Sequence, residues 1–224
     1  MKKRIVIIAG ARIRDLEWLR RELKTAGPGA IICADGGARY ARLLGETPAL
    51  IVGDMDSLTG RLRRFFTERG VPFAAYPARK DETDTWLALE RAIAMGAAEV
   101  TILGALGQRL DHTLANIGLL LLGSERGVRV TLRDEDCEIF TVKRRATVQG
   151  EKGQTVSLFA LGGEARGVTL AGFEYPLTDA VMTPSRPYGI SNRLAAAAGR
   201  IQVQEGCLLV IHYRSKEKTG EQSF

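Results

Sequence analysis

Leu50-Ile51-Val52-Gly53-Asp54-Met55-Asp56-Ser57 is a short apolar run that stops at a glycine and two acids. Such a run predicts a buried strand that reaches its carboxyl end near Gly53. In an extended segment the side chains of residues i and i+2 point the same way. We therefore expect Asp54 and Asp56 to face one cation while Met55 packs inward. Two adjacent carboxylates repel each other unless a cation or a proton intervenes, and Mg²⁺ is the usual hard divalent cation. A polar turn after a strand is the alternative interpretation.

Strand and helix patterns alternate on both sides of this stretch. The expected strands cover residues 4–9, 30–34, 50–52, 71–76, 100–103 and 128–132. The expected helices cover residues 15–26, 36–44, 60–69, 83–95 and 111–122. Near-continuous apolar strands that alternate with helices predict an α/β domain, in which helices cover both faces of a mostly parallel sheet.

The pattern changes near Phe140 into short alternating segments separated by turn glycines. Glu205-Gly206 lies between two such segments, 200–204 and 207–213, and predicts a hairpin between them. This part of the chain is expected to form a small all-β sandwich domain. The predicted domains are therefore residues 1–143, the catalytic domain, and residues 144–224.

Composition excludes several classes of function. The chain has 224 residues, of which 45% are hydrophobic and 26% charged, as in ordinary soluble proteins. The net charge of +6 comes from scattered basic residues without interleaved aromatics, so we expect no nucleic-acid partner. A basic surface also suits polyphosphate substrates. No apolar segment is long enough to span a membrane, and we expect no membrane partner.

Cysteine and histidine usage narrows the chemistry further. The three cysteines, Cys33, Cys137 and Cys207, lie far apart in or beside apolar segments. Buried thiols in a reducing cytosol are therefore expected rather than disulfides or a zinc site, which predicts a cytoplasmic protein. Two histidines, His112 and His212, are too few for a histidine-based metal centre.

Acids follow four successive predicted strands. They are Asp35, then Asp54 and Asp56, then Asp81 and Asp84, and finally Asp111. In open α/β sheets ligands bind outside the carboxyl ends of the strands, so these carboxylates are expected at one edge. The alternative for Asp81, Asp84 and Asp111 is helix N-capping. Capping does not explain why each strand end carries an acid.

Glycines and cations accompany these acids. Gly36-Gly37 at a predicted helix start allows backbone N–H groups to approach an anion closely. Lys80 and Arg109 supply positive charge near the same edge. Carboxylates, a cation such as Mg²⁺, backbone donors and basic side chains together indicate a nucleotide polyphosphate site. The sequence has neither the P-loop motif nor the dinucleotide-binding glycine motif.

The ordered motifs resemble those of the thiamine pyrophosphokinase family. They are Ala34-Asp35-Gly36-Gly37-Ala38, Gly53-Asp54-Met55-Asp56-Ser57, Asp81 to Asp84, Gly104 to His112 and Gly189-Ile190-Ser191-Asn192. The likeness extends over nearly the whole chain. It implies an α/β domain followed by a β-sandwich, a homodimer, ATP as donor and Mg²⁺ as cofactor. Some members place a tryptophan that stacks on thiamine just after the Ser-Asn pair, whereas Arg193-Leu194 follow here, with Tyr188 nearby.

The resemblance also implies roles for individual residues. Metal binding and catalysis fall to Asp54, Asp56, Asp81 and Asp84. ATP binding falls to Asp35, Gly36, Gly37, Lys80 and Arg109, of which Arg109 is also expected to be catalytic. Thiamine binding falls to Asp111, Ser191 and Asn192, in a pocket completed across the dimer.

The implied reaction transfers the terminal diphosphate of ATP to the primary hydroxyl of thiamine and releases AMP. A pterin-alcohol diphosphokinase would share the donor chemistry and differ in the acceptor pocket. A nucleotide-binding regulator would bind the cation and ATP without turnover. An assay with Mg²⁺, ATP and thiamine distinguishes these three hypotheses.

Overall fold

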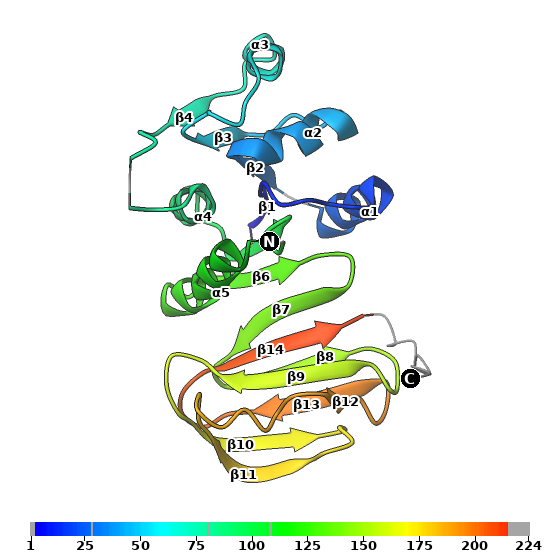
Figure 1. Ribbon diagram of the computed structural model, residues 1–224. Helices are drawn as coiled ribbons and strands as arrows, with labels where there is room; N and C mark the ends of the chain where they lie inside the picture. Colours follow the sequence, from blue (N-terminus) through cyan, green and yellow to red (C-terminus); the bar gives the residue numbers. More distant parts are fainter. Residues whose placement is uncertain (1–2, 28, 80, 108, 215–224) are drawn as a thin grey trace, which may run out of the picture. The chain divides into compact units, whose positions relative to one another are not determined.

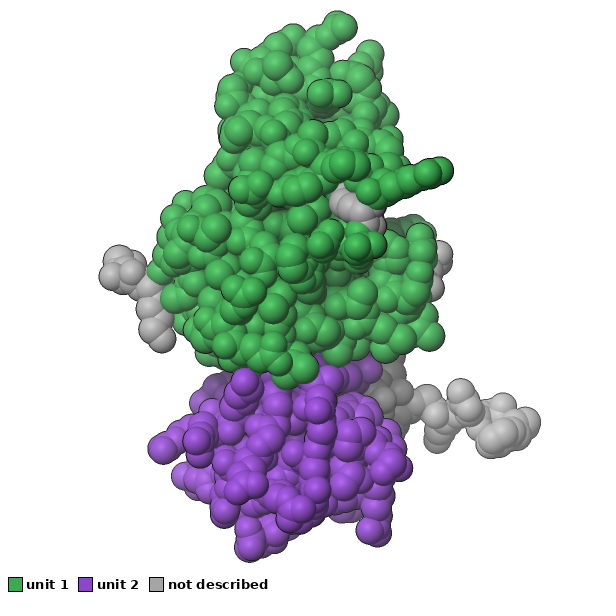
Figure 2. Space-filling view, turned by 90° about the vertical axis from the view of Figure 1, so that its left-hand side faces the viewer, with its two compact units in different colours: residues 1–135 green, residues 136–224 purple. Residues whose placement is uncertain are grey.

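The computed structural model describes residues 3–27, 29–79, 81–107 and 109–214. The chain divides into two compact units, unit 1 at residues 1–135 and unit 2 at residues 136–224 (Figure 2). This division lies eight residues before the sequence-based boundary at 143/144, because the strand Cys137–Val142 pairs with the last strand of unit 2. Among the described residues, no helix has the length and apolar character needed to cross a membrane.

Unit 1 contains a parallel sheet with strand order β6-β5-β1-β2-β3-β4 (Figure 1). The strands are β1 (Arg4–Ile8), β2 (Ala30–Ala34), β3 (Leu50–Gly53), β4 (Phe73–Ala75), β5 (Glu99–Leu103) and β6 (Arg129–Arg133). Each lies at or within a few residues of its predicted range. These runs are apolar on both faces because helices cover both sides of the sheet.

Two groups of helices form these covering layers. They are α1 (Leu16–Ala26), α2 (Ala38–Leu44), α3 (Gly60–Thr67), α4 (Asp84–Ala94) and α5 (Leu110–Glu125), with a 3₁₀ turn η1 at Asp35–Gly37. Helices α1, α2 and α3 contribute Leu19, Tyr40 and Phe66 to one buried cluster against the sheet. Helices α4 and α5 lie on the opposite face (Figure 1). The predicted α/β class is therefore confirmed.

Unit 2 consists of two antiparallel sheets, as the sequence predicted. One has the order β12-β9-β14-β7 and the other β11-β10-β13-β8. The strands are β7 (Cys137–Val142), β8 (Arg145–Gln149), β9 (Thr155–Ala160), β10 (Ala165–Ala171), β11 (Leu177–Met182), β12 (Asn192–Arg193), β13 (Ala198–Gln202) and β14 (Leu208–Tyr213). Their inward side chains form one apolar cluster that includes Leu158, Val168 and Val210.

The predicted hairpin between the last two strands is wrong. Strand β13 pairs with β8 and β10 in one sheet, whereas β14 pairs with β7 and β9 in the other. Glu205-Gly206 therefore carries the chain from one sheet to the other. Gly206 has a φ of +85°, and a Cβ there would lie 2.3 Å from the carbonyl oxygen of Glu164. Gly206 thus permits two backbone segments to approach closely. In the sequence alone, a glycine in this role cannot be distinguished from a glycine in a hairpin turn.

All three cysteines are buried and free. Cys33 belongs to β2 and Cys137 to β7, whereas Cys207 directly precedes β14. The prediction of buried thiols is confirmed.

Candidate active site

A cleft opens in unit 1 at the carboxyl ends of the central strands, with a volume of about 600 Å³. The chain runs from β1 to β2 on one side and later returns to place β5 on the other side of β1. This reversal is the position at which open α/β sheets bind their ligands. The residues after β1 and β5, including Gly10, Ala11 and Gly104, line the cleft.

Three acids converge in this region: Asp35, Asp54 and Asp84. Asp35 follows β2, Asp54 follows β3, and Asp84 begins α4. One carboxylate oxygen of each lies within 4.8 Å of those of the other two. Acids predicted at three successive strand ends therefore meet at one place.

Gly53 makes this convergence sterically feasible. Its φ is +150°, and a Cβ at this position would lie 2.9 Å from the Cβ of Asp35 and 3.1 Å from the Cγ of Asp84. A side chain here would push the two acids apart. The glycine that ends β3 is therefore required by the acid cluster as well as by the backbone conformation.

Asp35 carries the clearest sign that the cluster suits a cation. Asp35 is only 9% exposed, and its Oδ1 atom has no hydrogen-bond partner among the described residues. Burial is the main cause that raises the pKa of this carboxyl group, and the negative charges of Asp84 and Asp54 raise it further. Hydrogen bonds from the Ser57 hydroxyl and the Gly36 N–H lower the pKa and so oppose the increase. A hard divalent cation would relieve the repulsion and use the unpaired oxygen. The donor set therefore fits Mg²⁺.

The predicted parallel orientation of Asp54 and Asp56 is wrong, because the backbone is not extended after Gly53. Met55 has a φ of +68°, and the N–H of Asp56 donates to Oδ1 of Asp54 over 3.1 Å in a tight turn. Asp56 is exposed, accepts a hydrogen bond from the Ser57 hydroxyl, and lies outside the three-acid cluster. Met55 packs into the core, as predicted.

The start of α4 separates the roles of two predicted site acids. Thr83 caps this helix, because its hydroxyl accepts a hydrogen bond from the N–H of Trp86. Thr83, and neither Asp81 nor Asp84, is therefore the side-chain cap of this helix, and Asp84 in the first turn belongs to the three-acid cluster. Asp81 is exposed and lies outside the cluster. Lys80 lies outside the described residues.

The two glycines after Asp35 have different environments. Gly36 lines the cleft, next to the β-carbon of Ser57. Gly37 packs against the end of β1, and a Cβ there would lie 1.9 Å from the carbonyl oxygen of Ile8. Gly37 therefore permits close packing of η1 on the sheet.

Arg109 and Asp111 interact with each other at the start of α5. Nη2 of Arg109 lies 2.5 Å from Oδ2 of Asp111, and Nε lies 3.2 Å from Oδ1. The hydrogen bond from Arg109 lowers the pKa of Asp111 from its ordinary value of 3.8 to about 2. Arg109 lines the cleft. Asp111 is thus ionised and paired with an arginine of the candidate nucleotide site.

The cleft is also lined by two arginines that the sequence analysis did not indicate, Arg12 and Arg39. Arg39 donates to the carbonyl oxygen of Gly10 over 2.8 Å and to the hydroxyl of Tyr40 over 3.0 Å. That hydroxyl accepts a hydrogen bond from the N–H of Ile13 and donates to the carbonyl oxygen of Ala11. Helix α2 thereby fixes the loop after β1. Arg12 lies in that loop and Arg39 in α2, and neither belongs to a predicted motif, so only the fold distinguishes them from other surface arginines.

Asn116 is a third cleft residue without a sequence signal. It is buried in α5, and its Nδ2 donates to the carbonyl oxygen of Ala105 over 2.7 Å. In the same helix, the hydroxyl of Thr113 accepts a hydrogen bond from the N–H of Gly107. Helix α5 therefore holds the loop after β5 in place.

The predicted thiamine-binding residues of unit 2 have unequal surroundings. Asn192 is buried: its Oδ1 accepts from the N–H groups of Tyr175 and Arg193, and its Nδ2 donates to the carbonyl oxygen of Tyr175. Ser191 is exposed and has a φ of +57°. Tyr188 is 43% exposed, and its hydroxyl donates to the carbonyl oxygen of Val181. Asn192 thus organises a turn that presents Ser191 to solvent.

Two sequence models account for most of the chain. The model described as thiamin pyrophosphokinase, catalytic domain, matches residues 25–132. The model described as thiamin pyrophosphokinase, vitamin B1 binding domain, matches residues 139–208. The chain belongs to the thiamine pyrophosphokinase family. The earlier resemblance is thus confirmed by matches on both units.

Individual relatives in this family agree with the assignment. Thiamine pyrophosphokinase of Bacillus subtilis is 31% identical over 169 residues, which cover 75% of this chain and 79% of the relative. The crystal structure of a thiamine pyrophosphokinase from Bacillus subtilis superposes with a TM-score of 0.84 at 27% identity, over 95% of this chain and 100% of that one. A thiamin pyrophosphokinase from Geobacillus thermodenitrificans gives a TM-score of 0.77 at 26% identity, over 96% and 99%.

Proposed function

We propose that this member of the thiamine pyrophosphokinase family transfers the diphosphate of ATP to the primary hydroxyl of thiamine. The products are thiamine diphosphate and AMP. The observation that carries this proposal is the convergence of Asp35, Asp54 and Asp84 beside a cleft that is lined by Asp35, Asp84 and arginines. Family membership supplies the donor and the acceptor.

The proposed ATP site is the cleft of unit 1. Arg12, Arg39 and Arg109 line it and supply positive charge for the triphosphate. Gly36 lets the phosphates approach the backbone at the end of β2. We also assign Lys80 and Gly37 to the proposed ATP site, because the family resemblance implies this role for them.

Asp35, Asp54 and Asp84 would hold the cation, with Asp56 and Asp81 as proposed further ligands from the resemblance. Mg²⁺ bound there would neutralise negative charge on the phosphate oxygens and stabilise the charge of the departing AMP. The protein contributes three carboxylates, one of which has an unpaired buried oxygen.

The bonds that change follow from the products. The thiamine hydroxyl oxygen forms a bond to the β-phosphorus of ATP, and the bond from this phosphorus to the oxygen that bridges to the α-phosphate breaks. AMP leaves with that bridging oxygen, and the hydroxyl proton passes to a base. Asp81, exposed and adjacent in sequence to the cleft residue Glu82, is the proposed acceptor. Positioning and charge neutralisation account for most catalysis in such transfers.

Ser191 and Asn192 are the proposed thiamine contacts in unit 2, with Asp111 from unit 1. Because Asn192 also bonds backbone groups of Tyr175, we assign it the additional role of positioning Ser191. The acids near the cleft favour a cationic thiazolium. We propose a homodimer that completes the pocket, and a cytoplasmic location that suits the free thiols.

The deciding experiment incubates the protein with ATP, Mg²⁺ and thiamine and follows both products. Equal amounts of AMP and thiamine diphosphate are expected. Release of AMP in the presence of a pterin alcohol, and not in the presence of thiamine, would overturn the proposal that thiamine is the acceptor. Tight ATP binding without either product would overturn the assignment as an enzyme.

A further inference from the structure

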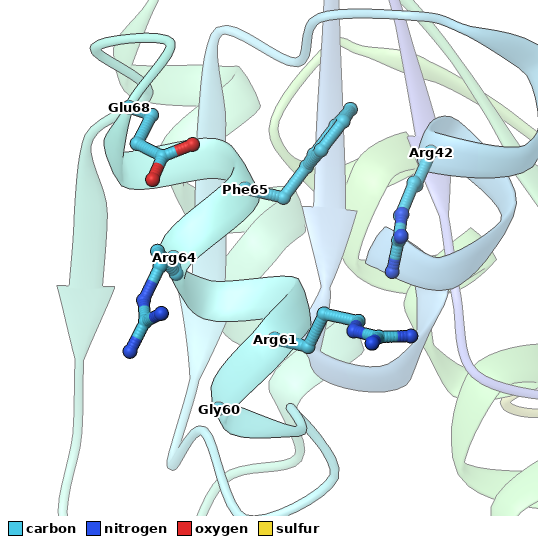
Figure 3. Close-up of a pocket in the computed structure, with 6 residues that line it drawn as sticks. All are labelled: Arg42, Gly60, Arg61, Arg64, Phe65 and Glu68. Carbon is cyan, nitrogen blue, oxygen red and sulfur yellow. The ribbon is translucent and has the colours of Figure 1, made fainter.

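Unit 1 contains a second hollow, which is lined by arginines and does not share a lining residue with the cleft. Its volume is about 520 Å³, and its lining residues are Arg42, Gly60, Arg61, Arg64, Phe65 and Glu68 (Figure 3). Arg42 comes from α2, and the others come from α3 or the residue that follows it. The hollow therefore lies between these two helices, on the face of the sheet that carries α1, α2 and α3.

The arginines of this hollow, Arg42, Arg61 and Arg64, form no ion pair among the described residues, although Glu68 also lines it. Other arginines of unit 1 do form such pairs, namely Arg4 with Glu99, Arg20 with Glu17 and Arg133 with Glu22. Arg61 also lies at the amino end of α3, where the helix dipole disfavours a cation. An anion in the hollow would offset both effects.

Phe65 organises the guanidinium groups. The guanidinium of Arg42 lies 5.1 Å from the centre of the Phe65 ring, and that of Arg69 lies 3.6 Å from it. Figure 3 shows the Arg61 side chain extending toward Arg42, whereas Arg64 points to the other side of the helix. The cation–π contact with Phe65 limits the conformational freedom of the Arg42 side chain. One of the guanidinium groups that face the hollow is therefore held in place before any anion binds.

We propose that Arg42 and Arg61 form an auxiliary site for a diphosphate group, separate from the cleft. Guanidinium groups bind phosphate oxygens through paired hydrogen bonds, and two of them facing one hollow match a ligand with two adjacent phosphates. Gly60 also lines the hollow, and the space beside it is open, because a Cβ at that position would meet nothing within 4 Å. Inorganic diphosphate and the diphosphate end of a nucleotide share this chemistry.

The test follows the Nε–H NMR signals of Arg42 and Arg61 while inorganic diphosphate is added at physiological salt without divalent cations. We expect both signals to shift to saturation. In Arg61→Ala the affinity for inorganic diphosphate, measured from the Arg42 signal, should fall by about tenfold or more, because one of the two guanidinium groups is lost. Arg63→Ala is the matched control: Arg63 is exposed on the same helix and does not line the hollow. Its loss should change the affinity by less than about twofold.

Equal losses in Arg61→Ala and Arg63→Ala, or shifts that never saturate, would overturn the proposal, because they indicate only the general positive field of α3. Signal dispersion checks that each variant is folded. A second titration with ADP distinguishes the sources: tighter binding of ADP indicates a nucleotide, and tighter binding of inorganic diphosphate indicates the free anion. The readout is at Arg42, so failure of thiamine diphosphate formation would not affect this test.

Discussion

At the scale of single residues, Asp54 and Asp84 are the most direct test of the site. Each places one carboxylate in the three-acid cluster, and asparagine keeps the size while removing the charge. We expect Asp54→Asn and Asp84→Asn each to lower turnover by at least about 100-fold, because charge stabilisation dominates such transfers. Binding of Mn²⁺, measured by electron paramagnetic resonance, should weaken in parallel.

Glu82→Gln is the matched control for these substitutions. Glu82 lines the same cleft and carries the same charge but lies outside the cluster. Its turnover and Mn²⁺ affinity should stay within about threefold of the parent protein. If Asp84→Asn behaves like Glu82→Gln while its circular dichroism is unchanged, the cluster is not the cation site.

The chemical type of the site residues was predictable, whereas their geometry was not. Asp35, Asp54 and Asp84 stand out in the sequence because each follows an apolar strand pattern or opens the next helix. The left-handed conformation of Met55, which turns Asp56 away from the cluster, leaves no comparable signal. Arg39 has none either, because its contact with Gly10 depends on how α2 packs beside β1.

At the scale of elements, the packing of η1 on β1 depends on Gly37. A Cβ at this position would lie 1.9 Å from the carbonyl oxygen of Ile8, an atom that belongs to a central strand. Gly37→Ala should therefore lower the free energy of unfolding by about 3 kcal/mol or more. Gly36→Ala is the control, because its Cβ would meet its nearest neighbour at 3.5 Å. Urea denaturation compares the two, and equal losses of stability would contradict the packing argument.

The loop after β1 provides a functional prediction at the same scale. Removing the Tyr40 hydroxyl leaves the N–H of Ile13 and the carbonyl of Ala11 without their partner, at a cost of about 1–3 kcal/mol. Because this loop carries Arg12 into the cleft, Tyr40→Phe should raise the KM for ATP several-fold and leave the KM for thiamine unchanged.

Tyr76→Phe serves as the control for Tyr40→Phe. The Tyr76 hydroxyl also accepts hydrogen bonds in unit 1, from Arg91, but Tyr76 does not line the cleft. Its steady-state constants should match those of the parent protein. Equal KM values for ATP in both variants would show that the loop does not need the Tyr40 hydroxyl.

Local patterns identified most elements because each helix and strand carries its own periodicity. The error at Glu205-Gly206 has a specific cause. A turn glycine between two apolar segments occurs in hairpins and in connections between sheets, and the partner of β13 is set by the residues of β8 and β10. Pairing between distant segments is a tertiary property that a local pattern does not contain.

At the scale of the whole molecule, the proposed ATP site belongs to unit 1, whereas the proposed thiamine contacts come from unit 2 and, through Asp111, from unit 1. The cleft and the three-acid cluster lie entirely in unit 1, whereas Ser191 and Asn192 lie in unit 2. The change of sequence pattern predicted two domains, but it could not assign the strand Cys137–Val142, whose partner β14 is the last strand of the chain. The proposed completion of the thiamine pocket by a second copy is a contact between two chains, which no pattern within one sequence describes.

This division predicts that donor and acceptor binding can be impaired independently. Ser191→Ala should raise the Kd for thiamine about tenfold or more, because an exposed hydroxyl at a fixed turn is lost, and leave the Kd for ATP unchanged. Asp84→Asn should weaken binding of the ATP–cation complex much more strongly than binding of thiamine. Isothermal titration of each ligand into each variant measures both effects. A rise in the Kd for ATP in Ser191→Ala would contradict the separation, because a residue of unit 2 would then act on the cleft of unit 1.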